Sequence, residues 1–181
     1  MYLSRDPHIY GKCLRLQFYL LRRKFHFDNI NELAPIAEEI NPIQAYLLIE
    51  KEQFGDRLHV NWEMGGCLDL MISSLTIQPL VENAIHHGLM KRITGGKLTI
   101  RITDHDTYVE ISVEDDGVGI NETELKGLLE RAPNARSGIG LLNTDLRLKR
   151  LFGKGLQITS VPNHGTTVSF IVYKDLEDVG K

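Results

Sequence analysis

The spacing of apolar residues changes repeatedly along the chain, and these changes restrict the folds that it can adopt. Apolar residues recur every three or four positions, as in helices that bury one face, over three segments: 35–54, 75–88 and 141–152. Strand-like patterns fall at five places: 58–64, 97–103, 108–114, 156–161 and 166–173. Helical and strand-like segments that alternate in this way predict an α/β layer sandwich.

Several features predict how these elements begin, end and connect. Pro42 is expected to bend or interrupt the first helix, because proline has no backbone N–H to donate, and Gly55 is expected to end it. The polar loop 104–106 predicts a hairpin between the second and third strands. The connection 115–140 holds one short amphipathic turn and is too long for a plain linker, so we expect a functional lid. Residues 13–27 predict a further helix whose packing face is undefined.

Composition excludes several classes of protein. The 181 residues suffice for one ordinary domain with an appended helix. The chain has 21 Lys and Arg against 24 Asp and Glu, a net charge of -3, so nucleic acid is not an expected partner. It has no secretory signal and no apolar run of about 18 residues, so any link to a membrane is expected from regions outside this sequence. Cys13 and Cys67 show no disulfide or zinc spacing, which is typical of reduced thiols in a cytoplasmic domain.

Two glycine motifs suggest contact with a nucleotide, although the chain lacks both the GxxxxGK[ST] and the GxGxxG patterns. Residues 115–119, DDGVG, follow a strand, and a carboxylate there can accept a hydrogen bond from an exocyclic amine such as that of adenine. Residues 138–141, GIGL, precede a helix, whose first amides and positive dipole end favour phosphate. Each motif alone can equally be a surface turn, but together they favour a nucleotide site.

The second helical segment carries a polar stripe opposite its buried face: Gln78, Glu82, Asn83, His86 and His87. An Asn amide oxygen is a suitable ligand for Mg²⁺, which keeps several waters and takes few protein oxygens while phosphates supply the rest. Two alternatives are a solvated helix face and a zinc site built on the histidines. Zinc is disfavoured, because neighbouring histidines on a helix point in different directions and no third ligand has helical spacing to them.

Four ordered motifs resemble the N, G1, G2 and G3 boxes of the GHKL superfamily, which includes histidine kinases, type II topoisomerases, mismatch-repair ATPases and a heat-shock chaperone. They are QPLVENAIHHG (78–88), EDDGVGI (114–120), SGIGLLN (137–143) and GTTVSF (165–170). IQAYLLIEKEQFGDRL (43–58) resembles more narrowly the stretch before the N box in LytS/YehU-type sensor histidine kinases. The resemblance covers residues 33–173 and implies a two-layer α/β sandwich whose mixed, mostly antiparallel sheet carries helices on one face.

The resemblance implies one set of residues around the adenine base of ATP. Asp115 is expected to accept a hydrogen bond from the adenine amino group. Gly117 and Gly119 are expected to let the chain pass close to the base. Thr166 is expected to support adenine through water, and Ile120 to contact the nucleotide.

It implies a second set around the phosphates and Mg²⁺. Asn83 is expected to coordinate Mg²⁺, and Glu82 to orient a water or a metal-bound group. His86 or His87 is expected near the phosphates. Three residues at the entry to the last helix are expected to contact the phosphates, and the two glycines among them to hinge the lid: Gly138, Gly140 and Leu141.

The implied activity is transfer of the γ-phosphoryl group of ATP to a histidine and then to an aspartate of a response regulator. The chain has no full copy of the NPHFLFN-like phosphoacceptor segment of these kinases, and the sequence around His8 is only a faint echo of it. The histidine is therefore expected from another segment or from the second protomer of a full-length homodimer. Residues 1–32 are then a helical remnant of the dimerisation and phosphoacceptor region, 33–174 the ATP-binding kinase domain, and 175–181 a tail.

Two other functions fit the same motifs. One is a serine kinase or ATPase on this fold, as in anti-sigma factors, which a phosphoprotein stable in acid and labile in alkali distinguishes from a histidine kinase. The other is a nucleotide-gated interaction module without catalysis, which binding of ATP without transfer identifies.

Overall fold

The computed structural model describes residues 33–130 and 139–174, and every structural statement refers to them. The main sheet has five strands in the order β2-β4-β5-β7-β6. Their bounds are β2 (Leu58–Met64), β4 (Gly96–Asp104), β5 (Tyr108–Asp115), β7 (Gly165–Tyr173) and β6 (Gln157–Val161). β2 runs parallel to β4, and the other neighbouring pairs are antiparallel. The expected mixed, mostly antiparallel sheet and the hairpin between β4 and β5 are therefore confirmed.

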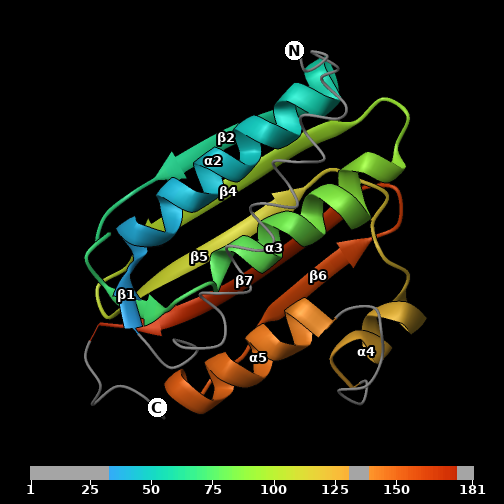
Figure 1. Ribbon diagram of the computed structural model, residues 1–181. Coiled ribbons are helices and arrows are strands. Elements are labelled where there is room, and N and C mark those ends of the chain that lie inside the picture. The colour runs from blue at the N-terminus through green and yellow to red at the C-terminus, as the bar shows by residue number, and fades with distance from the viewer. Residues whose placement is uncertain (1–32, 131–138, 175–181) are drawn as a thin grey trace, which may run out of the picture.

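Helices lie on one face of this sheet, and α2, α3 and α5 run side by side across it (Figure 1). The helical segments are α2 (Ile36–Phe54), η1 (Gly55–Arg57), α3 (Ile77–Asn83), η2 (Ala84–Gly88), η3 (Leu89–Lys91), α4 (Glu122–Glu130) and α5 (Ile139–Phe152). Within the described ranges, no helix combines the length and the apolar character that crossing a membrane requires. The predicted two-layer α/β arrangement is confirmed.

Apolar side chains between the two layers form the core. β4 and β5 contribute the residues that alternation predicts to point inward, each at most 1% exposed: Leu98, Ile100, Ile102, Val109, Ile111 and Val113. α2 contributes one stripe of buried residues, among them Ile36, Ile40, Ile43 and Leu47. Burying one such side chain stabilises a fold by roughly 1.5 to 3 kcal/mol, so contact between the layers dominates the stability of this domain.

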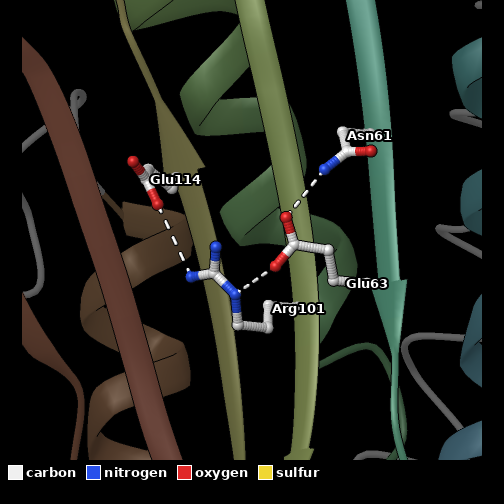
Figure 2. A network of polar contacts seen from close by, with 4 residues as sticks. All are labelled: Asn61, Glu63, Arg101 and Glu114. Carbon is white, nitrogen blue, oxygen red and sulfur yellow. Dashed lines mark hydrogen bonds and ion pairs between the residues drawn. The ribbon is translucent and has the colours of Figure 1, made fainter.

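The residues that alternate with these core positions form the polar face of the sheet. On this face Arg101 donates to Glu63 at 2.5 Å and lies 3.6 Å from Glu114, while Asn61 donates to Glu63 at 2.8 Å (Figure 2). The hydrogen bond from Arg101 lowers the pKa of the Glu63 carboxyl below its ordinary value. Ion pairs between partly exposed side chains add little stability, so this network is typical of a solvated surface.

Two helices differ from the sequence prediction. The expected interruption at Pro42 is wrong, because a proline removes only one helical hydrogen bond and the buried Ile40 and Ile43 hold α2 on both sides. Gly55 ends that helix as predicted, with a φ of 55°. The helix expected over 75–88 is an α-helix only to the end of α3, and continues as the π-helix η2.

The connections also differ from their predicted form. The 115–140 connection contains the helix α4 rather than a single turn, because the side chain of Asn121 accepts a hydrogen bond from the backbone N–H of Glu124 at 2.9 Å and caps it. A two-stranded antiparallel sheet of β1 (Leu33–Pro35) and β3 (Met71–Ser73) was not predicted. The helix predicted over 13–27 lies outside the described residues.

The start of α3 is held by a carboxylate from α2. Glu39 is 7% exposed, and its two oxygens accept hydrogen bonds from the backbone N–H groups of residues 75–77. Arg147 of α5 donates to the carbonyl oxygen of Leu75 at 2.8 Å and to Thr76 Oγ1 at 3.2 Å. Burial raises the pKa of Glu39, although the three N–H groups and the charge of Arg147 favour its ionised form. These contacts fix α3 to both neighbouring helices.

Candidate functional site

A pocket of about 200 Å³ opens between α3, η2 and the start of α5. Its lining residues are Pro79, Glu82, Asn83, His86, His87, Gly140 and Leu141. All except Pro79 belong to the set that the family resemblance implies around the phosphates and Mg²⁺. The fold therefore brings the polar stripe of one helix against the glycine-rich entry of another.

The change from α-helix to π-helix shapes the wall of this pocket. α3 ends at Asn83, and in η2 the backbone hydrogen bonds reach back five residues instead of four. The wider turn keeps Ala84 and Ile85 in the core while His86 and His87 both line the pocket. π-Helical turns occur frequently at functional sites.

Two polar side chains of the pocket have defined environments. Gln78 Nε2 donates to Glu82 Oε1 at 2.9 Å and orients that carboxylate. Partial burial lowers the pKa of His87, and the nearby Lys91 and His86 lower it further. His87 is therefore neutral near pH 7, and is better suited to hydrogen bonding than to neutralising a phosphate.

A second group of predicted residues surrounds Asp115, the last residue of β5. Asp115 is 4% exposed, and its Oδ1 accepts a hydrogen bond from the backbone N–H of Gly117 at 2.9 Å. Burial raises the pKa of Asp115 to about 6; the Gly117 N–H opposes this shift, and the negative charges of Asp116 and Glu114 add to it. A buried carboxylate of this kind is stabilised by a ligand that donates a hydrogen bond to it.

Glycines pack against the Asp115 carboxylate because no side chain fits there. A Cβ atom at Gly88 would lie 2.3 Å from Asp115 Oδ1, and one at Gly117 would lie 2.3 Å from the carbonyl carbon of Gly88. The backbone N–H of Val118 also donates to the Gly88 carbonyl oxygen at 3.3 Å. The end of η2 thus contacts the chain directly after β5. Gly88 was missed as a site residue, although it closes the QPLVENAIHHG motif.

A serine joins the remaining residues of this group. Thr166 is the neighbour of Asp115 across β5 and β7, and its Oγ1 lies 2.9 Å from Ser160 Oγ. Ser160 Oγ also accepts a hydrogen bond from the backbone N–H of Ile120 at 2.8 Å. Ser160 was not predicted, because an isolated serine in a strand carries no specific signal.

The predicted residues therefore form two groups that meet at Gly88. The residues expected near the phosphates line the pocket. The residues expected near adenine lie outside its lining: Asp115, Gly117, Gly119, Ile120 and Thr166. Gly138 lies outside the described residues.

The donors in the pocket fit only one kind of metal site. Over 33–130 and 139–174 there is no group of three His, Cys, Asp or Glu side chains that could hold a metal ion alone. Asn83 offers an amide oxygen on the pocket wall. This donor suits Mg²⁺ that takes its other ligands from water and phosphates.

Known proteins resemble this chain over most of its length. Residues 73–176, more than half of the chain, match the family described as histidine kinase-, DNA gyrase B-, and HSP90-like ATPase. YwpD of Bacillus subtilis (strain 168) is 38% identical over 155 residues, which is 84% of this chain and 55% of YwpD. The sensor histidine kinase YpdA of Escherichia coli (strain K12) is 37% identical over 78% of this chain and 25% of YpdA. The sensor protein LytS of Oceanobacillus iheyensis is 37% identical over 77% of this chain and 25% of LytS.

Solved structures share the fold. The catalytic domain of the histidine kinase ThkA has a TM-score of 0.58 and 22% identity, over 79% of this chain and 96% of that domain. The mycobacterial sensor histidine kinase MprB has a TM-score of 0.59 and 18% identity, over 78% of this chain and 96% of that chain. At such identities the likeness shows the fold alone.

The motifs, the two-layer fold and the matched sequences agree, and the resemblance to LytS-type kinases is confirmed. The chain belongs to the family of histidine kinase-, DNA gyrase B-, and HSP90-like ATPases.

Proposed function

We propose that the chain is the ATP-binding catalytic domain of a two-component sensor histidine kinase, which transfers the γ-phosphoryl group of ATP to a histidine. One observation carries this proposal: η2 begins next to Asn83 and ends at Gly88, which packs on the Asp115 carboxylate. The amide proposed for Mg²⁺ and the carboxylate proposed for adenine are therefore joined by one short helical segment. The relatives that are named sensor histidine kinases support the same activity.

Asp115 is proposed to select the base. Its carboxylate accepts a hydrogen bond from the adenine amino group, and Gly88 and Gly117 pack closely against that carboxylate. Guanine carries a carbonyl oxygen where adenine carries this amino group, and a carbonyl oxygen cannot donate a hydrogen bond to the Asp115 carboxylate. The site therefore favours ATP over GTP. Thr166 and Ser160 supply hydroxyl groups beside the base.

The pocket is proposed to hold the triphosphate. Mg²⁺, when bound, neutralises part of the phosphate charge during a loose phosphoryl transfer. Asn83 holds that ion, and Glu82, already oriented by Gln78, positions a water beside it. The first amides of α5, including that of Gly140, face the phosphates, and His86 approaches the terminal phosphate.

The partners are proposed from the same relatives, because the chain spans only 25% of YpdA. A histidine segment from the same protomer or from a second one receives the phosphoryl group. An aspartate of a response regulator then accepts it. In the full-length protein we propose a homodimer that places this domain on the cytoplasmic side of a membrane.

Phosphotransfer to a separate acceptor tests the proposal. The chain is incubated with labelled ATP, Mg²⁺ and the intact phosphoacceptor domain of a homologous kinase. We expect Mg²⁺-dependent labelling that is lost in acid and kept in alkali. Asp115→Asn should abolish nucleotide binding, and Asn83→Ala should mainly remove the Mg²⁺-dependent step. Asp106→Asn, on an exposed loop, is the control.

Three outcomes contradict the proposal. Wild-type nucleotide affinity in Asp115→Asn refutes the role of Asp115 with adenine. Labelling that is stable in acid and lost in alkali identifies a serine kinase of the anti-sigma type. Nucleotide binding without any transfer identifies a nucleotide-gated interaction module.

A further inference from the structure

His86 lies between the candidate pocket and helix α2. Its ring lines the pocket, and its side chain is 41% exposed. Its Nε2 lies 3.1 Å from the hydroxyl oxygen of Tyr46 and 3.8 Å from Oε1 of Glu50. Tyr46 and Glu50 are one turn apart on α2, 5% and 0% exposed, and neither belongs to the pocket lining.

The burial of Glu50 determines which edge of the His86 ring faces α2. A carboxylate taken out of water is costly unless hydrogen-bond donors or positive charge stand close to it. Nε2 of His86 is a group of this kind when the ring is an imidazolium, because both ring nitrogens then carry a proton. The attraction draws this edge of the ring toward α2, and leaves the opposite edge, with Nδ1, for the pocket.

The contact with Tyr46 is compatible with both neutral tautomers of His86, and only one of them places a proton on Nδ1. When the Tyr46 hydroxyl donates to Nε2 of a neutral ring, the single ring proton is on Nδ1. When the ring is an imidazolium, Nε2–H faces Glu50 and Nδ1 is again protonated. In both forms the nitrogen on the pocket side is a hydrogen-bond donor, which suits an anionic ligand.

We propose that Tyr46 and Glu50 are positioning residues, which hold His86 so that its Nδ1–H donates to the terminal phosphate of ATP. This inference rests on the proposed function and adds two residues of α2 to it. Neither residue touches the nucleotide. Both act only through the orientation and protonation of His86, so their effect is confined to ligands that carry a third phosphate.

Calorimetric titration with Mg-ATP and with Mg-ADP tests the inference on the full chain. Tyr46→Phe and Glu50→Gln should each weaken ATP binding about fivefold to tenfold, because the hydrogen bond from His86 to the terminal phosphate is weakened but not removed. The affinity for ADP should change less than about twofold. Glu52→Gln, an exposed residue of the same helix, is the matched control and should change neither affinity.

A double-mutant cycle separates positioning from a structural role. His86→Ala should give the same selective loss of ATP affinity, and adding Glu50→Gln to it should cause no further loss. An unchanged ratio of ATP to ADP affinity in Tyr46→Phe and Glu50→Gln overturns the inference, as does a loss that adds to that of His86→Ala. If Glu50→Gln does not fold, Tyr46→Phe decides alone. A wild-type chain that binds neither nucleotide refutes the proposed function as well, whereas binding that is abolished by Asp115→Asn leaves only this inference at stake.

Discussion

Adenosine binding should weaken as the pH falls below 6, because Asp115 must be ionised to accept the adenine amino proton strongly. The pKa of Asp115 is about 6, raised by its burial at the end of β5. A protonated carboxyl must first lose its proton, so each pH unit below this pKa costs about 1.4 kcal/mol of binding free energy, or tenfold in affinity. Adenosine is the appropriate ligand, because it carries no phosphate group that titrates in the same range.

The assay is an NMR titration of the chain with adenosine between about pH 8 and about pH 5. The dissociation constant should be flat above about pH 7 and roughly tenfold larger at pH 5. Glu114→Gln is the matched control, because the negative charge of this exposed neighbour helps to raise the pKa of Asp115. In that variant the midpoint should move to lower pH while the slope stays the same.

A dissociation constant that does not change over this pH range refutes the contact between Asp115 and the base. So does a midpoint that stays in place in Glu114→Gln. A rise in affinity toward acid pH contradicts the sign of the argument, because it means that the protonated carboxyl binds the ligand.

Two further predictions concern the elements that hold the site. Glu39→Gln should lower the free energy of unfolding by about 2 to 3 kcal/mol in urea denaturation, because the start of α3 loses charged hydrogen bonds to three N–H groups. The control Glu38→Gln, on the exposed side of α2, should change the free energy of unfolding by less than about 0.5 kcal/mol. Equal effects of the two substitutions contradict the capping role of Glu39. Gly88→Ala should weaken adenosine binding by more than about tenfold, because its Cβ would displace the Asp115 carboxylate. A Cβ atom at Gly140 would meet only Pro79 Cβ, at 3.8 Å, so Gly140→Ala should keep the thermal midpoint of the wild type. Full adenosine affinity in Gly88→Ala would argue against close packing of Gly88 on Asp115.

Local periodicity predicted the elements because their burial is periodic. β2 occupies the predicted residues 58–64. In β4 and in β5 every second side chain lies in the core, as the alternating pattern predicts. The pocket residues of α3, η2 and α5 were assigned from motifs, and the structure brings those it describes together. Asp115 could be proposed from the sequence because an acidic residue at a strand end, before two glycines, is itself a local signal.

Contacts between distant segments were not predictable in this way. Glu39 accepts hydrogen bonds from Thr76 and Ile77, which follow it by 37 and 38 positions in the sequence. Tyr46 contacts His86, which follows it by 40 positions. In a linear pattern Glu39 is one more polar position on an amphipathic helix and Tyr46 is one of its apolar positions, and nothing marks their partners. The π-helix was also missed, because a helix with one widened turn keeps nearly the same apolar spacing as a regular one.

The widened turn of η2 links chain length to the composition of the pocket wall. A π-helical turn takes up one extra residue while the chain on either side keeps its direction, so removing one position between Asn83 and Gly88 would give a regular α-helix with both ends nearly in place. Gly88 would then still pack on the Asp115 carboxylate. Deleting His86, for example, would leave the two halves of the site joined and would take one side chain from the pocket wall.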